Sequence, residues 1–267
     1  MITEERRNKI LQIAEQSGFV SLQQLMAEVG ASESTIRRDL EFLDRQGQLH
    51  RTRGGAAYAG ESLTDFDVRQ NQSSVEKRRI ARRAAELILP GETVLLDGGT
   101  TTLEVARSLT GKTLQVVTNS LPIAAQLMNQ PAVELIFVGG YVYPKTGVAL
   151  GDLAVSTLQH IHVSRLVMSA GGLTESGLFN SNALLVETER KMIEAAEHVT
   201  LVADSTKFGQ RALAQICDLT AVDEIITDDR LSHSWRETLT DLGIALEIVD
   251  VTTAAVTAGE KAIQSRV

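Results

Sequence analysis

Two adjacent arginines near the N-terminus, Arg37 and Arg38, follow the small hydroxylated residues Ser32, Ser34 and Thr35. A guanidinium group can fork onto guanine O6 and N7, and Ser or Thr hydroxyls can reach base edges or phosphates. These residue types at this spacing favour contact with the major groove of DNA. The alternative is an ordinary solvated helix face, which is the more common origin of such residues when the segment is taken alone. The neighbouring segments favour DNA contact instead.

A second basic segment follows at residues 45–57, which contain no acidic residue. Gln48–Thr52 and Arg53–Ala56 are predicted to form a small hairpin, because Gly54 and Gly55 favour a tight turn. Arg51 and Arg53 on this hairpin could bind phosphates or follow the minor groove, as the wing of a DNA-binding module does.

A loop in the second half of the chain could bind an anion. Asp97, Gly98, Gly99, Thr100, Thr101 and Thr102 follow a short apolar run and open a predicted helix. Backbone N–H groups and the positive end of a helix dipole suit a phosphate, although a plain strand-to-helix turn would use the same residues. No lysine follows the glycines and the Gly-x-Gly-x-x-Gly spacing is absent, which argues against nucleotide hydrolysis.

Other predicted strand ends also carry small or polar residues. They are Thr118, Asn119 and Ser120, then Gly139 and Gly140, then Ser169 to Gly172 with Gly171 among them, and finally Asp204 and Lys207. Asp204 could bind sugar hydroxyls and Lys207 could bind phosphate. Each of the other strand ends, taken singly, is more typical of a turn. Ligands bind at the carboxyl ends of parallel strands, so these residues are predicted to form one effector site.

Catalytic, metal and cofactor sites are not expected. The strand ends offer few carboxylates for proton transfer, and His160, His162, His198 and His233 lack the spacing of metal ligands. Cys217 is the single cysteine, which excludes an internal disulfide and favours a small buried residue.

Three helices are predicted to position the two arginines. The first covers Glu4–Glu15, the second follows the capping box of Ser21 and Gln24, and the third begins after Ser32. Ile36, Leu40 and Leu43 have i, i+4, i+7 spacing, so they face a core and leave Ser34 and Arg38 on the opposite side. A helix, a tight turn and a second helix is the geometry that places a helix in a DNA groove.

The remainder of the chain alternates short apolar strands with helices, which predicts an α/β domain with a mostly parallel sheet covered on both faces. The expected strands are Thr93–Leu96, Leu114–Thr118, Val133–Val138, Arg165–Ser169, Val199–Ala203, Glu224–Ile226 and Ala245–Val249. Residues 1–57 are predicted to form the DNA-binding domain, 58–74 a polar linker and 75–267 the effector domain.

The composition is that of an ordinary globular protein, with 267 residues and a net charge of −8. Residues 1–57 hold equal numbers of basic and acidic residues, so the whole acidic excess lies beyond residue 57. An acidic second domain is compatible with a basic DNA-binding surface on the first. No apolar run approaches about 18 residues and the polar start lacks a signal peptide, which predicts a cytoplasmic protein without membrane contact.

The segment from Ser32 to Leu40, followed by Arg51-x-Arg53-Gly54-Gly55-Ala56, resembles the winged helix-turn-helix of DeoR-type bacterial transcriptional regulators. The loops at Asp97–Thr102, Thr118–Ser120, Gly139–Gly140 and Ala203–Gly209 resemble the effector domain of the same family. The resemblance implies a fold similar to ribose-5-phosphate isomerase and CoA transferases, a phosphorylated sugar as effector, and repression relieved by it. Where the family often has Gly-Ala-Asp-Gly, this chain has Ser169–Gly172, so Gly171 replaces a carboxylate.

Two functions follow as hypotheses. The first is a repressor of a sugar-metabolism operon that binds double-stranded operator DNA as a homo-oligomer, a dimer or tetramer, under control of a sugar phosphate. The second is a sugar-phosphate isomerase or transferase with a DNA-binding appendage. The few carboxylates at the strand ends favour the first, a protein that is not an enzyme.

Overall fold

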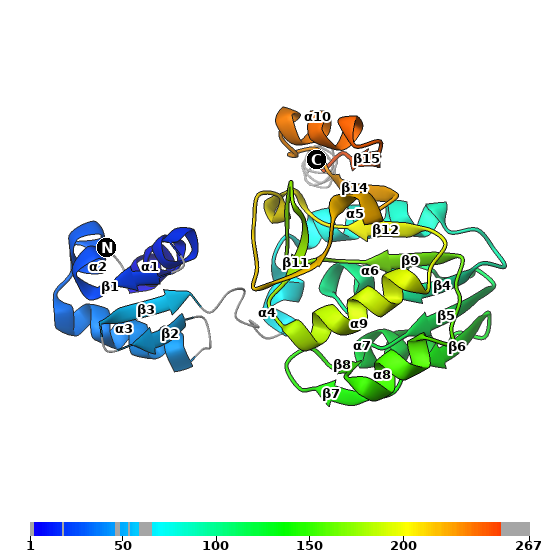
Figure 1. Cartoon of the computed structure of the whole chain (residues 1–267), viewed down its shortest axis with the longest axis horizontal. Helices are drawn as coiled ribbons and strands as arrows, with labels where there is room; N and C mark the ends of the chain where they lie inside the picture. Colours follow the sequence, from blue (N-terminus) through cyan, green and yellow to red (C-terminus); the bar gives the residue numbers. More distant parts are fainter. Residues whose placement is uncertain (1–2, 18, 46–48, 53, 59–65, 252–267) are drawn as a thin grey trace, which may run out of the picture. The chain divides into compact units, whose positions relative to one another are not determined.

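The computed structural model describes residues 3–17, 19–45, 49–52, 54–58 and 66–251 (Figure 1). The chain divides into two compact units, Met1–Arg69 and Gln70–Val267. A short helix, α4 (Phe66–Asn71), lies within the range expected as a linker.

The N-terminal unit combines three helices with a small antiparallel sheet. Its elements are α1 (Thr3–Ser17), β1 (Phe19–Ser21), α2 (Leu22–Val29), α3 (Glu33–Arg45), β2 (Leu49–Thr52) and β3 (Gly55–Tyr58). The predicted helices and the β2–β3 hairpin are confirmed, while β1 was not predicted and pairs with the other edge of β3. The capping box of Ser21 and Gln24 is also confirmed.

The turn between α2 and α3 is tight because Gly30 ends α2 in the left-handed region, at φ 70°, which glycine adopts without steric cost. The predicted stripe of Ile36, Leu40 and Leu43 is buried in the core of this unit, against Ile10 of α1 and other apolar side chains. Burial of this stripe orients α3 and leaves its opposite face in solvent.

The C-terminal unit is built on a seven-stranded parallel sheet. Its strands run in the order β15 (Ala245–Val249), β14 (Glu224–Asp228), β12 (Val199–Val202), β9 (Arg165–Met168), β4 (Thr93–Leu96), β5 (Leu114–Thr118) and β6 (Val133–Phe137). All seven predicted strands are therefore present, with ends within two residues of the expected ones. Chain order reverses between β4 and β9, and such a switch point is where open parallel sheets bind ligands.

Helices and smaller hairpins surround this sheet. The helices are α5 (Ser74–Leu87), α6 (Thr100–Ser108), α7 (Leu121–Leu127), α8 (Asp152–Leu158), α9 (Ala183–Glu194) and α10 (His233–Asp241). The additional strands are β7 (Tyr141–Tyr143), β8 (Val148–Leu150), β10 (Gly172–Thr174), β11 (Gly177–Asn180) and β13 (Ala214–Cys217), with short 3-10 turns η1 (Ser205–Lys207) and η2 (Leu219–Ala221). Helix α5 packs on α6, α6 packs on α7, and α8 lies beside α9 (Figure 1).

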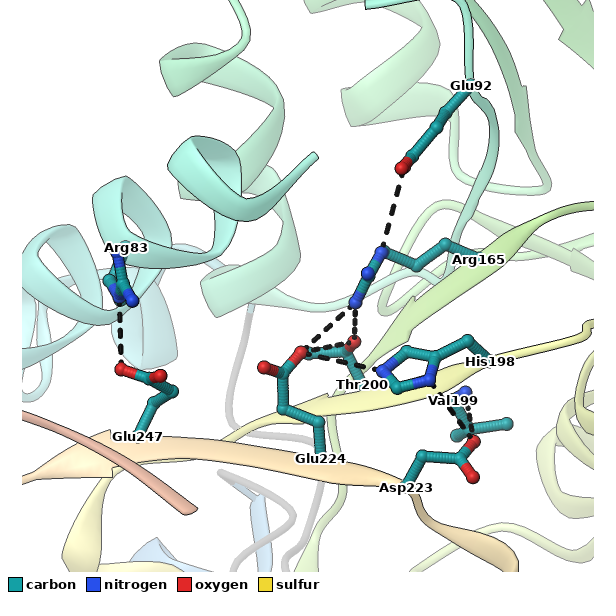
Figure 2. A network of polar contacts seen from close by, with 9 residues as sticks. All are labelled: Arg83, Glu92, Arg165, His198, Val199, Thr200, Asp223, Glu224 and Glu247. Atoms are coloured by element: carbon teal, nitrogen blue, oxygen red, sulfur yellow. Dashed lines mark hydrogen bonds and ion pairs between the residues drawn. The ribbon is translucent and has the colours of Figure 1, made fainter. Parts of the chain in front are cut away.

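The amino-terminal edge of the sheet is held by a polar network around Arg165, the first residue of β9 (Figure 2). Its Nη1 donates to Thr200 Oγ1 at 2.7 Å and to Glu224 Oε2 at 3.1 Å, and its Nε lies 3.7 Å from Glu92 Oε2. Thr200 is the second residue of β12, Glu224 is the first of β14, and Glu92 directly precedes β4. The network therefore ties the strands together at the edge opposite the candidate ligand loops.

Candidate functional site

The exposed face of α3 carries the residues predicted to read DNA. Ser32 begins the helix as predicted, because its Oγ accepts from Thr35 N at 3.4 Å. The Ser32 hydroxyl also shares hydrogen bonds with Ser34 Oγ at 3.1 Å and Thr35 Oγ1 at 2.9 Å. Ser34 and Arg38 are exposed, whereas Thr35 is half-buried.

The arginines on α3 differ in how they are paired. Arg37 forms an ion pair with Glu33 at 2.7 Å, and Arg45 forms one with Glu41 at 2.6 Å. Within the part of the chain that the structure describes, Arg38 makes no hydrogen bond or ion pair. A DNA contact by Arg38 therefore requires no internal ion pair to be broken.

A buried carboxylate that sequence analysis missed fixes α3 to α1. Asp39, whose side chain is 3% exposed, accepts from Arg6 Nε at 2.6 Å and from Arg7 Nε at 3.0 Å. The hydrogen bond from Arg6 to Asp39 raises the pKa of that arginine, and the Arg7 guanidinium also stacks 3.6 Å from the centre of the Phe42 ring. The two guanidinium groups offset the negative charge of Asp39.

The wing residues are only partly described. Arg51 on β2 is exposed, and its backbone N–H donates to Asp44 Oδ1 at 3.1 Å, which joins β2 to the end of α3. Arg53 lies outside the described residues.

At the switch point, the Asp97–Thr102 segment forms a closed turn at the N-terminus of α6. Gly99 N donates to Thr102 Oγ1 at 2.7 Å, and the Thr102 hydroxyl donates to Gly99 O at 3.0 Å. Thr102 therefore stabilises the turn. Thr100 and Thr101 are buried beside it at the first two positions of the helix.

Neighbouring strand ends pack closely against this turn, so a Cβ on either of its glycines would have to displace a neighbouring side chain. A Cβ on Gly98 would lie 2.3 Å from Val148 Cγ2, and one on Gly99 would lie 2.2 Å from Ser169 Oγ. Gly140 is also constrained, because a Cβ there would lie 2.8 Å from Leu150 O, while Gly139 has open space around it. The ends of β4, β9 and the β7–β8 hairpin thus converge.

The β5 end is held mainly by its own polar groups. Thr118 Oγ1 donates to Leu96 O at 2.7 Å and accepts from Ser120 N at 3.1 Å, which joins β5 to β4. Asn119 Nδ2 donates to Ala149 O at 3.0 Å, but its Oδ1 is buried and has no hydrogen-bond partner among the described residues. A buried amide oxygen without a partner could accept a hydrogen bond from a bound ligand.

The remaining predicted ligand residues lie at the same edge on other strands. Asp204, at the end of β12, is buried, and its carboxylate accepts from the backbone N–H of Thr206 at 3.2 Å and from the Thr206 hydroxyl. Lys207 ends η1 with a half-buried side chain. Gly171 N donates to Phe179 O at 2.9 Å, so Gly171 extends the pairing of the β10–β11 hairpin.

Glu189 of α9 is a further buried carboxyl group that sequence analysis did not select. It is 3% exposed, and its Oε1 accepts from Asn180 Nδ2 at 2.6 Å. Burial raises the pKa of Glu189 well above its ordinary value, the negative charge of Asp97 raises it further, and the bond from Asn180 opposes the rise. The sequence pattern could have indicated Glu189, because it lies on the same inward helix stripe as Leu185 and Met192, where a carboxylate is out of place.

Comparison with known families matches both units. A model of the DeoR-like helix-turn-helix domain matches residues 6–61, and a model of the DeoR C-terminal sensor domain matches residues 72–229. The chain belongs to the DeoR family.

Named DeoR-family relatives are similar over almost their whole length. The glycerol-3-phosphate regulon repressor of Escherichia coli K12 is 34% identical over 247 residues, which cover 91% of this chain and 98% of that protein. The HTH-type transcriptional regulator GolR of Listeria innocua is 31% identical, covering 92% of this chain and 98% of its own. Among solved structures, ribose 5-phosphate isomerase A of Methanocaldococcus jannaschii aligns with 52% of this chain and 55% of its own, with 16% identity and a TM-score of 0.38.

Two further properties of this DeoR-family chain concern metals and membranes. Among its described residues, no group of three or more His, Cys, Asp and Glu side chains is arranged to hold a metal ion. None of the helices in the described ranges is long and apolar enough to span a membrane.

Proposed function

We propose that this chain is a DNA-binding repressor of a sugar-metabolism operon whose affinity for DNA is lowered by a phosphorylated sugar. The observation that carries the proposal is the exposed face of α3, where Arg38 stands unpaired among the described residues opposite the buried Ile36, Leu40 and Leu43. Family relatives that are named as repressors or transcriptional regulators support the same function.

The DNA-binding residues proposed are Ser32, Ser34, Thr35, Arg37, Arg38, Arg51 and Arg53, within a domain of residues 1–57. Arg38 has the geometry for base contact, since it projects from the face that the core stripe leaves open. Ser34 and Thr35 lie one turn earlier and are suited to phosphates or base edges. A palindromic operator requires at least a dimer, and we propose that the protein binds as a homo-oligomer.

The effector residues proposed lie at the carboxyl edge of the sheet, in a domain of residues 75–267 joined by a linker of residues 58–74. They are Asp97 to Thr102, Thr118 to Ser120, Gly139, Gly140, Gly171, Asp204 and Lys207. The α6 N-terminus and the Gly98–Gly99 turn favour phosphate, and Lys207 supplies a cation on a strand end two places along the sheet.

The proposal also assigns no reaction to the effector domain. Glu189 and Asp228 are buried carboxyl groups of this domain that the sequence analysis did not select. Repression without turnover is consistent with the names of the relatives.

The deciding experiment begins with DNA selected from a random pool by the full-length protein. Arg38→Ala should bind the selected duplex about 1–3 kcal/mol more weakly in anisotropy titrations and should relax base preference when selection is repeated. Arg79→Ala removes the same charge from an exposed position on α5 and serves as the control. If both variants lost the same affinity for the selected duplex, or if Arg38→Ala lost none, the assignment of this face of α3 to DNA contact would be wrong.

A further inference from the structure

Strand β6 ends the seven-stranded sheet, and its outer side has no partner strand among the described residues (Figure 1). The strand pairs with β5 alone, and Val138 N, just after its end, donates to Thr118 O of β5 at 2.8 Å. Successive residues of a strand direct their backbone N–H and C=O groups to opposite sides. Leu135 and Phe137 therefore direct these groups away from β5, where a further strand could bind them.

The side chains along this edge are apolar and accessible. Ile136 is 38% exposed and Phe137 is 39% exposed. Tyr141 on β7 and Met128 at the end of α7 are each more than half exposed. Proteins commonly protect a free strand edge with several charges, a proline or a bulge, and an unprotected apolar edge tends to pair with another chain.

The same region is almost free of charge. Residues 113–144, which include β5, α7, β6 and β7, contain one charged side chain, Glu134, whereas 22% of the whole chain is charged. Because the acidic excess of the chain lies beyond residue 57, two copies of the C-terminal unit repel each other in general but can meet at low electrostatic cost through this neutral face. A strongly charged partner would find few opposite charges here. The charge distribution therefore favours a second copy of the chain as the partner.

We propose that two copies of the chain pair through β6, antiparallel about a two-fold axis at Ile136, so that one sheet continues across both copies. This inference goes beyond the proposed function, which requires a homo-oligomer but does not identify its interface. In this register Leu135 of each copy lies opposite Phe137 of the other, and each such pair exchanges both N–H···O bonds. The two Ile136 side chains lie opposite each other, and apolar cross-strand pairs of this kind stabilise a sheet.

The register is selected by the neighbouring residues. With the axis at Ile136, each Glu134 lies opposite Val138 of the other copy, so the two carboxylates do not face each other. An axis one residue earlier, at Leu135, would require the Val133 N–H as a donor to the other copy. That N–H already donates to Gln130 O at 3.1 Å.

Disulfide cross-linking of the full-length protein tests both the interface and its register. Residues opposite each other in a non-hydrogen-bonded antiparallel pair have Cα atoms about 4.5 Å apart, within the range of about 4.4–6.8 Å that a disulfide spans. Ile136→Cys should therefore form a covalent dimer under mild oxidation. Glu134→Cys lies on the same strand away from the axis, and Leu213→Cys lies at an exposed position before β13, so neither should cross-link. The wild type, which keeps Cys217, gives the background.

An exchange of charges tests the pairing without a covalent bond. Ile136→Glu should raise the dissociation constant of this contact at least about a hundredfold, because it places two like charges opposite each other, and should halve the mass of the assembly in sedimentation velocity. Ile136→Lys should have the same effect, and an equimolar mixture of the two variants should restore the wild-type mass. Leu213→Glu, at an exposed position away from β6, should associate like the wild type. Thermal melts establish that each variant is folded, and if a charged variant is not, the cross-linking result still decides.

Each contrary outcome has a defined meaning. A wild type that remains monomeric at micromolar concentration overturns the inference and leaves this edge of β6 to a different partner. An assembly that is unchanged in Ile136→Glu, or that cross-links equally well through Glu134→Cys, also overturns it. So does a mixture of the Glu and Lys variants that fails to reassociate. The DNA-binding test of Arg38→Ala is separate, because its failure refutes the proposed function and leaves this interface standing.

Discussion

Replacing Gly98 by alanine should destabilise the C-terminal unit measurably, because the new methyl group has no room. Its Cβ would lie 2.3 Å from Val148 Cγ2 and 3.4 Å from Ser120 Cβ, whereas carbon atoms in contact are ordinarily about 3.5–4.0 Å apart. Val148 is fully buried on β8, and the adjacent Ala149 N donates to Asn119 O at 2.8 Å, so β8 resists moving away.

Overpacking of this kind costs about 1–3 kcal/mol. For a unit of this size, about 2–4 °C in Tm corresponds to each kcal/mol, so Gly98→Ala should lower Tm by about 2–12 °C. Differential scanning calorimetry and urea unfolding would measure the change. Gly54→Ala is the control for the glycine-to-alanine change itself, since a Cβ there meets no atom within 4 Å.

A double-mutant cycle tests whether Val148 is the cause. Val148→Ala alone should destabilise the protein by about 2–3 kcal/mol, from lost burial at about 0.8 kcal/mol per methyl group and from the resulting cavity. Because it also removes the clashing Cγ2, the double variant should lose at least about 1 kcal/mol less than the sum of the two single losses. Strict additivity, or a Gly98→Ala protein within about 0.5 kcal/mol of the wild type, would refute the reasoning.

Three other predictions address the effector domain. Lys207→Ala should keep its affinity for DNA but no longer respond to the phosphorylated sugar that most raises the Tm of the wild type. Anisotropy titrations of DNA with and without that sugar would check this. Linkage requires that DNA lower the affinity for the sugar by the same factor. Glu189 has a folded-state pKa above its ordinary 4.5, so its contribution to stability is complete below pH 4.5 and is lost as pH rises through the folded pKa. Urea unfolding across this range should show wild type losing stability relative to Glu189→Gln, and parallel curves would count against the shift. Finally, NMR should show no incorporation of solvent deuterium into candidate sugar phosphates incubated with the protein. Deuterium incorporation that survives repurification of the protein but disappears in Asp204→Ala would support the enzyme alternative.

The strands of the large sheet could be predicted from sequence because strands buried on both faces are continuous apolar runs, such as Thr93–Leu96. The shorter strands β7, β8, β10, β11 and β13 escaped prediction. Each has three or four residues and pairs as a hairpin or through distant partners, so the local pattern holds too few residues to indicate a period. Strand β1 was missed for the same reason, since its pairing partner β3 lies over thirty residues away.

The candidate sites were predictable to a different extent. Turn residues such as Gly98 and Gly99 carry their chemistry in their type and their place after a strand, and so they could be selected from sequence. Asp39 lies on the inward stripe of Ile36, Leu40 and Leu43, where a carboxylate is out of place. Its partners Arg6 and Arg7 lie on another helix and could not be selected from sequence.

The attachment of α3 to α1 has a consequence for altering the operator that the protein recognises. Asp39 forms ion pairs with Arg6 and Arg7 on the buried side of α3, and Ser34 and Arg38 take no part in these ion pairs. Side chains at positions 34 and 38 can therefore be exchanged without loosening the helix from its support. The module is suited to libraries in which these two positions are randomised and new operators are selected, with Asp39, Arg6 and Arg7 left unchanged.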